Sequence, residues 1–394
     1  MRENNKNFGE KIENVREHRN DLDTLRVFAT ILLIYFHTAM FFVLAYGVFF
    51  QNEELSLEIT IFYLFLWIWH MPLFFLLAGM STFYSLNFRS GTQYVKERLK
   101  RLFIPFILGI FIVIPPIFYF YPIIFDGTYF EFYLKYFEHG YLTYGIYFLA
   151  FYIHLWFLLY LLVFSMVALP IFLMLKKKKK MQQKISVFLL ALPLILISVC
   201  LNFIFPSRLP FFYFIYDVAN VFCYFTIFIF GFLIVGNSHF ENSIDRNKKL
   251  AFALAVITSV IVLFIQIHTI TASNIFSSIG IYIGAAIFLG LFTFCRWCWL
   301  FTFFGYGRKY LTKKTSLISH LSEISLPFYI LHLPVIIIIA YFVLQWEAII
   351  LVKFLIITTS ALFITIFLCE LIKTNNITRF IFGMRPKVKK KEVE

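Results

Sequence analysis

The chain has few charged residues for its length: only 14% of its 394 residues are Asp, Glu, Lys or Arg, against about 25% in a typical soluble protein. Apolar residues make up 61% of the sequence, and the mean hydropathy is +0.82. A monomer of this composition would not stay dissolved in water, which disfavours a soluble enzyme, a nucleic-acid-binding protein and a disordered scaffold. The composition indicates an integral membrane protein.

Cysteines and the common catalytic motifs are also scarce. The five cysteines lie in or beside apolar runs, a distribution that does not suit a disulfide framework. Cys295-Arg-Trp-Cys298 is formally a CxxC, but without a second pair or a histidine cluster it predicts no metal or redox site. The sequence has no Walker loop, GxSxG elbow, HExxH motif or repeat of fixed period. We therefore expect no metal cofactor.

Long apolar runs, by contrast, are abundant. A helix needs roughly 20 apolar residues to cross a hydrocarbon core of about 30 Å. Ten runs meet this length: 27–47, 59–86, 103–124, 145–175, 185–205, 214–236, 250–270, 275–297, 324–346 and 349–372. The first 26 residues are hydrophilic, which argues against a cleavable signal peptide. The sequence predicts an all-α, polytopic membrane protein with about ten transmembrane helices.

The basic residues predict how these spans are oriented. The formal net charge is +14, and 32 of the 35 Lys and Arg residues fall on one side of the ten spans. Cytoplasmic loops carry such an excess, so we expect both termini in the cytoplasm of a bacterium and the protein in its cytoplasmic (inner) membrane. The run Lys176–Lys180 is interpreted as a topology anchor that also contacts anionic membrane lipid. Because the charge reports orientation, we expect no nucleic-acid partner.

The expected organisation has three parts. Residues 1–20 form a cytoplasmic N-terminal tail, residues 21–374 form the transmembrane domain, and residues 375–394 form a basic cytoplasmic C-terminal tail. No segment resembles a separate soluble domain. Any chemistry must therefore arise inside the transmembrane domain or at its two surfaces.

Four histidines lie inside predicted spans, where an ionisable side chain is costly and is a functional candidate by default. His37 follows Arg26 by 11 residues, which is about 16 Å or three turns of helix, so the two share a face and His37 lies near mid-depth. Asp23 lies one turn before Arg26 on the same side. The first span therefore offers a carboxylate and a guanidinium at its inner end and an imidazole at its middle.

The other polar residues in the spans leave two interpretations open. His70, His154 and His332, taken singly, are either hydrogen-bonded packing residues or functional groups. Glu370, near the inner end of the last span, is either a structural partner for a basic residue or a site residue.

Arg98 and Arg101 are three residues apart and face the same way on a helix. With Lys100 between them they suit phosphate groups, because guanidiniums bind phosphate bidentately. The alternative is a plain stop-transfer cluster.

Five motifs in order resemble the membrane acyltransferase-3 superfamily. They are Asp23-Thr-Leu-Arg26 with His37, His70-Met-Pro-Leu-Phe-Phe-Leu-Leu-Ala-Gly79, Arg98-Leu-Lys-Arg101, His154-Leu-Trp-Phe-Leu158 and Ser325-Leu-Pro-Phe-Tyr-Ile-Leu-His332-Leu-Pro334. The last two, with the tail Phe380-Ile-Phe-Gly-Met-Arg-Pro386, look most like the glucan biosynthesis protein C branch. Two residues depart from the pattern: Ala78 stands where many members have Ser, and His70 where the glucan type has Arg.

This resemblance implies a membrane O-acyltransferase that moves an acyl group from cytoplasmic acyl-CoA (acetyl-CoA or succinyl-CoA) to a hydroxyl of an extracytoplasmic carbohydrate. In the glucan branch the implied activity is succinylation of periplasmic glucans. The implied general base is His37, assisted by Arg26 and Asp23. The resemblance places the CoA phosphates at Arg98, Arg101 and Lys100, and it implies that the acceptor or the transition state is contacted by His70, His154, Tyr329, His332 and Glu370.

Two questions stay open at this point. A succinyl carboxylate would want a cation near mid-depth, and we expect no Lys or Arg there, which favours a neutral acyl group. The main rival function is a secondary transporter or exporter that uses the midplane histidines as a proton relay. Transporters often show inverted repeats, and no internal symmetry is visible in this sequence.

Overall fold

The computed structural model describes residues 19–44, 50–120, 127–139, 153–177, 186–205, 218–271 and 278–387. Within these ranges the backbone forms helices, turns and short loops, and no strand. The prediction of an all-α fold is confirmed. The outer parts of both predicted tails (1–18 and 388–394) and the start of the predicted span 145–175 lie outside the described residues.

Ten helical stretches among the described residues are long and apolar enough to cross a membrane, one for each predicted run. The chain is therefore a multi-pass membrane protein. The helices are α2 (Asn20–Ala39), α3 (Leu57–Phe88), α4 (Gly91–Arg98), η1 (Leu99–Phe103), α5 (Ile104–Ile112), α6 (Ile114–Tyr119), α7 (Tyr129–His139), α8 (Trp156–Lys177), η3 (Val187–Leu190), α9 (Ala191–Ile204), α10 (Val218–Val235), α11 (Ser238–Thr271), α12 (Ser278–Tyr310), α13 (Ser316–Val343), α14 (Ile350–Thr374) and α15 (Asn376–Ile381).

Some helices extend beyond the apolar runs that predicted them. Helix α11 begins at Ser238 rather than near 250, and α12 ends at Tyr310 rather than near 297. Hydropathy marks only the apolar part of a helix, whereas the backbone hydrogen bonds continue through polar residues. In these extensions Glu241 forms ion pairs through its Oε1 atom, at 3.0 Å from Arg19 Nη1 and at 3.6 Å from Arg308 Nη1. The two ion pairs join the start of α2 to α11 and α12.

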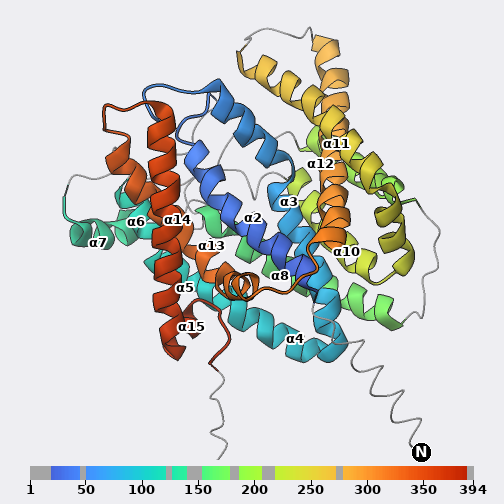
Figure 1. Ribbon diagram of the computed structural model, residues 1–394, viewed down its shortest axis with the longest axis horizontal. Coiled ribbons are helices and arrows are strands. Elements are labelled where there is room, and N and C mark those ends of the chain that lie inside the picture. Colours follow the sequence, from blue (N-terminus) through green and yellow to red (C-terminus); the bar gives the residue numbers. More distant parts are fainter. Residues whose placement is uncertain are drawn as a thin grey trace, which may run out of the picture.

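Helix α2 lies in the middle of the bundle (Figure 1), where it contacts α3, α12, α13 and α14. Helices α11 and α12 pack together on one side of α2, and α13 and α14 pack together on the opposite side (Figure 1). The spans of α3 and α13 are the most buried of the ten. The helix that carries Arg26 and His37 is thus enclosed by protein on several sides.

Glycines bring α3 and α10 into backbone contact. A Cβ on Gly79 of α3 would lie 2.0 Å from the carbonyl oxygen of Phe228, and a Cβ on Gly231 of α10 would lie 2.2 Å from that of Leu76. Any larger residue at either position would have to move a helix, since both obstacles are backbone atoms. Small residues at such crossings are typical of membrane helix pairs, where close backbone approach replaces the hydrophobic drive. This contact explains the glycine that ends the second motif.

Prolines interrupt the backbone hydrogen bonds of several spans, among them α3 and α13. A proline has no N–H, so the carbonyl four residues earlier in the helix loses its intrahelical partner. Pro72 frees the carbonyl of Ile68 in α3, and Pro334 frees that of Ile330 in α13. A carbonyl left unpaired in a membrane costs several kcal/mol, on the order of the loss of a hydrogen bond in an apolar medium. Each of these groups needs a partner from elsewhere in the bundle.

Candidate active site

Three imidazoles stand in a row beside the central helix. The ring centre of His37 in α2 lies 5.0 Å from that of His332 in α13. The ring centre of His332 in turn lies 5.4 Å from that of His154, just before α8. Three of the four histidines singled out in the sequence therefore meet, although they come from the first, fourth and ninth spans.

Accessibility distinguishes His37 from the other two rings. His332 and His154 are buried, whereas the His37 side chain is only partly so. The Nδ1 atom of His37 is buried and has no hydrogen-bond partner among the described residues. A partly accessible imidazole can serve as a general base through its accessible edge, and the fold leaves its Nδ1 unused.

Backbone carbonyls fix the tautomers of the buried histidines. His332 Nδ1 bonds the carbonyl of Tyr329 at 2.6 Å, and His154 Nε2 bonds that of Ile330 at 2.8 Å. A carbonyl only accepts, so each of these nitrogens carries the proton. The remaining nitrogen of each neutral ring is a lone-pair acceptor, and neither has a partner within the described part of the chain.

The partner of His154 is one of the proline-freed carbonyls. Pro334 leaves Ile330 without its intrahelical bond, and the ring of His154 takes the vacant oxygen. The hydroxyl of Tyr329 donates to the backbone carbonyl of His154, so the two segments hold each other by two bonds. Tyr329 therefore uses its hydroxyl, and His154 its Nε2, for a structural hydrogen bond.

His70 comes from α3 and contacts α2 close to His37. Its Nε2 bonds the carbonyl of Ala29 at 2.7 Å, and its ring centre is 5.9 Å from that of Phe36, the neighbour of His37. Its Nδ1 has no hydrogen-bond partner among the residues described. The ring therefore fixes α3 to α2 and retains one acceptor nitrogen.

Arg296 corrects the expectation that no basic residue lies near mid-depth. The sequence pattern grouped it with the polar segment 296–322, but it stands at the middle of the span Tyr282–Tyr310 and is buried. Its Nε donates to Ile68, the carbonyl freed by Pro72, at 3.0 Å. Its guanidinium also stacks on the ring of Phe292, 4.9 Å from the ring centre. Hydropathy averages over many residues and so misses one charge that a folded neighbour satisfies.

Arg26 and Asp23 pair as the sequence spacing predicts. The Nη1 atom of Arg26 lies 2.9 Å from Asp23 Oδ1, and its Nη2 donates to Ser81 Oγ of α3 at 2.8 Å. The guanidinium is thus oriented by a carboxylate from its own helix and a hydroxyl from the next. It remains about one-third exposed, so it can still meet a ligand at this end of the bundle.

The R-x-x-R segment is not regular α-helix. Residues Leu99–Phe103 form a wide π-helical turn, which ends two residues before Pro105. A π-turn rotates side chains away from their α-helical positions. As a result Arg98 and Arg101 have different partners: Arg98 bonds Thr82 and stacks on Tyr94, whereas Arg101 bonds the carbonyl of Gly383. The expectation that the two face the same way is thereby modified.

Other charged residues at this end were not singled out in the sequence. Glu97 accepts contacts from Arg89 at 2.8 Å, Arg385 at 3.5 Å and Arg101 at 3.8 Å. Lys100, between the two predicted arginines, is exposed. Both residues belong to segments that the sequence analysis noted: Glu97 directly precedes Arg98, and Arg385 lies in the tail motif. Their positions in the sequence do not indicate that they meet in space.

Glu370 belongs to a separate contact. Its carboxylate lies 2.7 Å from the ring of His320, and Lys373 also contacts that ring at 3.0 Å. His320 is 12 residues before His332 on the same helix, which is about 18 Å along its axis. The fold therefore does not bring Glu370 to the histidine row.

The cysteines show no sign of a shared ligand. Cys295 and Cys298 are both buried, and Cys295 Sγ lies 3.3 Å from the hydroxyl of Ser259. Over the described ranges no group of three or more His, Cys, Asp and Glu side chains is arranged to hold a metal ion.

Comparison with known proteins gives one family and no individual relative. No curated protein and no solved structure matches the chain significantly. The acyltransferase-3 family model, which describes an acyltransferase domain, matches residues 19–373. That range begins at the first described residue and ends at the last turn of α14, so it includes both the histidine row and the arginines of the R-x-x-R segment. The chain belongs to the acyltransferase-3 family and is a membrane acyltransferase.

Proposed function

We propose that this enzyme moves an acyl group from acyl-CoA at the cytoplasmic surface to a hydroxyl group of an extracytoplasmic carbohydrate. The observation that carries the proposal is the position of His37. It lies on the central helix with an unpartnered nitrogen, and three turns from it the same helix carries Arg26 at the arginine-rich end. A base at mid-depth between a basic surface and the opposite surface suits a donor and an acceptor that approach from opposite sides.

His37 acts as the general base. It takes the proton of the acceptor hydroxyl while the hydroxyl oxygen forms a bond to the thioester carbonyl carbon. The carbon–sulfur bond then breaks, and the thiolate leaves with a proton returned by the same ring, so the reaction ends with an ester and a free thiol. Such proton transfer by a positioned histidine contributes typically about 10²- to 10⁴-fold to a rate.

The neighbouring imidazoles support this reaction as acceptors. The free nitrogens of His332 and His154 carry lone pairs, because their protons are used on backbone carbonyls. A lone pair accepts a hydrogen bond from a sugar hydroxyl, or from the N–H of a protonated His37. Two roles were considered for these residues: contact with the carbohydrate that accepts the acyl group, and hydrogen-bond donation to the oxyanion. The first is favoured, because donation to an oxyanion requires an N–H.

The arginine-rich end holds the donor. Arg98 and Arg101 bind the phosphates of CoA, with Lys100 and Arg26 beside them, because guanidiniums form bidentate bonds with phosphate. The pantetheine arm then extends along α2 and places the thioester near His37, about 16 Å further along the helix. This assignment makes the arginine-rich end cytoplasmic, in agreement with the positive-inside rule.

The acyl group is acetyl or succinyl, and the glucan branch of the family points to succinyl and to a periplasmic glucan. The earlier objection to succinyl no longer holds, since Arg296 supplies a cation near mid-depth. Its guanidinium already bonds Ile68 and stacks on Phe292, so a carboxylate would have to share it.

The test is acyl transfer by purified protein in proteoliposomes, with acyl-labelled CoA supplied at one surface and oligosaccharide acceptors at the other. We expect thioester consumption together with labelled ester, and loss of both in His37→Ala protein that inserts normally. Solute movement without thioester consumption would support the transporter instead. Membership of an acyltransferase family favours the enzyme.

A further inference from the structure

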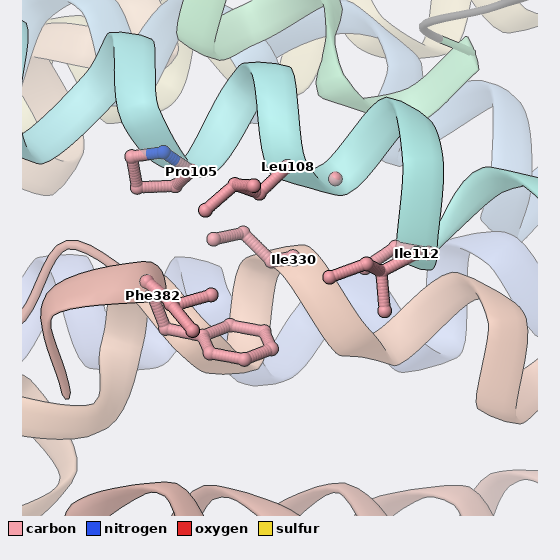
Figure 2. A pocket seen from close by; sticks show the side chains of 8 residues that line it. Pro105, Leu108, Ile112, Ile330 and Phe382 are labelled. Carbon is pink, nitrogen blue, oxygen red and sulfur yellow. The ribbon is translucent and has the colours of Figure 1, made fainter. Parts of the chain in front are cut away.

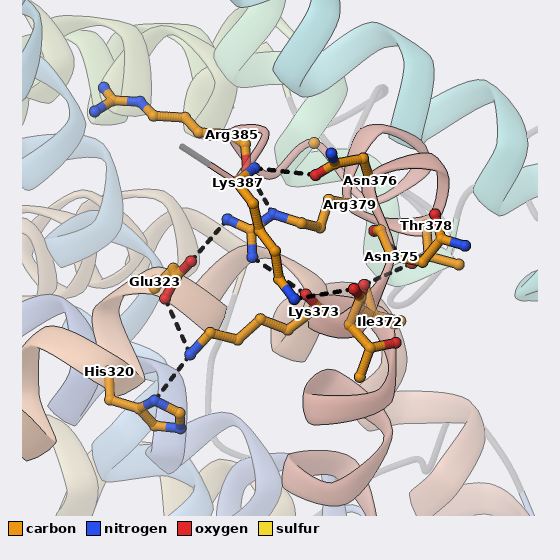
Figure 3. Close-up of polar contacts among 12 residues, drawn as sticks. His320, Glu323, Ile372, Lys373, Asn375, Asn376, Thr378, Arg379, Arg385 and Lys387 are labelled. Carbon is orange, nitrogen blue, oxygen red and sulfur yellow. Dashed lines mark hydrogen bonds and ion pairs between the residues drawn. The ribbon is translucent and has the colours of Figure 1, made fainter. Parts of the chain in front are cut away.

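The chain beyond α14 folds back onto the bundle. Its α15 helix starts directly after α14, and Arg379 within it is buried. The Nη2 atom of Arg379 donates to Glu323 of α13 at 2.8 Å, and its Nε donates to the carbonyl of Arg385 at 2.6 Å (Figure 3). One buried guanidinium therefore joins α13 to the end of the C-terminal segment, which we define as residues 375–387.

A glycine turn seats this segment against the R-x-x-R turn. Gly383 has a φ of +69°, a left-handed conformation, and a Cβ there would lie 2.5 Å from the carbonyl oxygen of Arg101. Arg101 Nε donates to the carbonyl of Gly383 at 3.2 Å. Only glycine satisfies both the backbone angle and the close approach. The C-terminal segment is thus shaped to meet Arg101.

Apolar contact supports the same placement. Phe382 and Ile381 line a small apolar pocket together with Pro105 and Ile330. Figure 2 shows Phe382 across from Pro105, with Ile330 between them. Pro105 follows the R-x-x-R turn, and Ile330 is the residue whose carbonyl binds His154. The segment therefore packs between the arginine-rich end and the helix of the histidine row.

The result is an excess of positive charge at one point. Arg385 reaches Glu97 at 3.5 Å, and Arg89 and Arg101 contact the same carboxylate. Three guanidiniums thus contact one carboxylate. The side chain of Arg385 is 68% exposed, which leaves most of its five N–H donors available. This excess of positive charge favours an added anion, and guanidiniums bind phosphate through bidentate hydrogen bonds.

We propose that Arg385, held in place by the C-terminal segment, binds a phosphate group of the acyl-CoA donor. This inference rests on the proposed function, and it adds to the donor site a residue that lies beyond the matched family domain. The remaining contacts of the segment position Arg385. Neither Glu323 nor Arg379 touches the donor.

The experiment measures binding of free CoA to the full chain in lipid nanodiscs by calorimetry, with pantetheine as a probe that lacks phosphates. We expect Arg385→Gln to weaken CoA binding about tenfold, which corresponds to one charge-assisted hydrogen bond. Arg385→Lys should recover part of this loss. Pantetheine binding should be the same for all variants.

Lys387→Gln is the matched control, because it removes the same charge from the same segment. Lys387 Nζ reaches back to the end of α14, where it donates to the carbonyl of Thr374 (Figure 3). We expect its CoA affinity to stay within twofold of the wild type. Equal losses in the two variants, or no loss in Arg385→Gln, would overturn the proposal. Normal CoA binding without any acyl transfer would contradict the proposed function and leave the role of Arg385 standing.

Discussion

The ring of His37 lies 5.0 Å from the ring of His332, and each ring has one buried nitrogen without a partner among the described residues. The nitrogen of His332 carries a lone pair, since its other nitrogen donates to Tyr329. When His37 gains a proton from substrate, its new N–H therefore has an acceptor one ring away. The pair can share a proton that neither residue would hold well alone in a membrane.

Replacing His37 tests the base directly. His37→Asn keeps a polar side chain of similar length and removes the titratable group, so we expect acyl transfer to fall by about 10²-fold or more. Insertion and thermal stability should be nearly unchanged, because no structural hydrogen bond of the ring is lost. His320→Asn serves as the control, because His320 contacts Glu370 and lies far from the histidine row. Full activity in His37→Asn protein would remove His37 from the mechanism.

His332 should act through kcat rather than through affinity. His332→Phe fills the same space without the lone pair, and we expect kcat to fall about tenfold, the value of one hydrogen bond of about 1.4 kcal/mol. The KM for acyl-CoA should change little, because the donor phosphates lie at the other end of α2. Partial recovery with added imidazole would show that a missing base, and not a distorted bundle, causes the loss. A tenfold rise in the KM for acyl-CoA with an unchanged kcat would instead indicate that His332 serves only to pack the helices.

The arginines of the R-x-x-R turn should govern donor affinity. Arg98→Gln with Arg101→Gln removes two phosphate contacts, so we expect the KM for acyl-CoA to rise at least tenfold while that for the acceptor stays nearly constant. The rise should be smaller at high salt, where the wild-type attraction is already screened. Steady-state kinetics at two ionic strengths checks both points. If the dependence on acyl-CoA concentration is unchanged, the donor does not bind at this turn.

Arg296 and Pro72 should be energetically coupled. Arg296→Met leaves the carbonyl of Ile68 unpaired, whereas in a Pro72→Ala chain the restored backbone N–H can bond that carbonyl. Arg296→Met should therefore lower the Tm more in the wild-type background, which has Pro72, than in the Pro72→Ala background. The expected coupling is about 1–3 kcal/mol, the cost of an unsatisfied buried acceptor. Thermal unfolding of the four variants in detergent measures it, and additive effects would refute the pairing.

The glycine contact between α3 and α10 should tolerate no side chain. Gly79→Ala would place a Cβ 2.0 Å from the carbonyl oxygen of Phe228, so we expect poor folding and loss of activity. Gly290→Ala is the matched control, because its Cβ would meet only a side-chain methyl at 3.7 Å. Yield of folded protein by size-exclusion chromatography distinguishes the two. Normal yield of Gly79→Ala protein would mean that the helices pack less closely than described.

The spans and the pairing of Arg26 with Asp23 could be predicted from sequence because both depend on near neighbours in the chain. Hydropathy finds ten spans, and helical spacing puts Asp23 one turn from Arg26. The contacts of Arg296 and Arg385 could not be predicted, since each joins residues more than 200 positions apart. The π-turn before Pro105 was also missed, because the pattern of arginines assumed a regular helix.

The histidine row has a further consequence for the catalytic cycle. Its rings are oriented by backbone oxygens, and among the described residues no carboxylate contacts His37, His332 or His154. A proton taken up here thus meets no fixed counter-ion that would retain it. The row is suited to pass the proton on within the same turnover, to the departing sulfur, and to return uncharged for the next substrate.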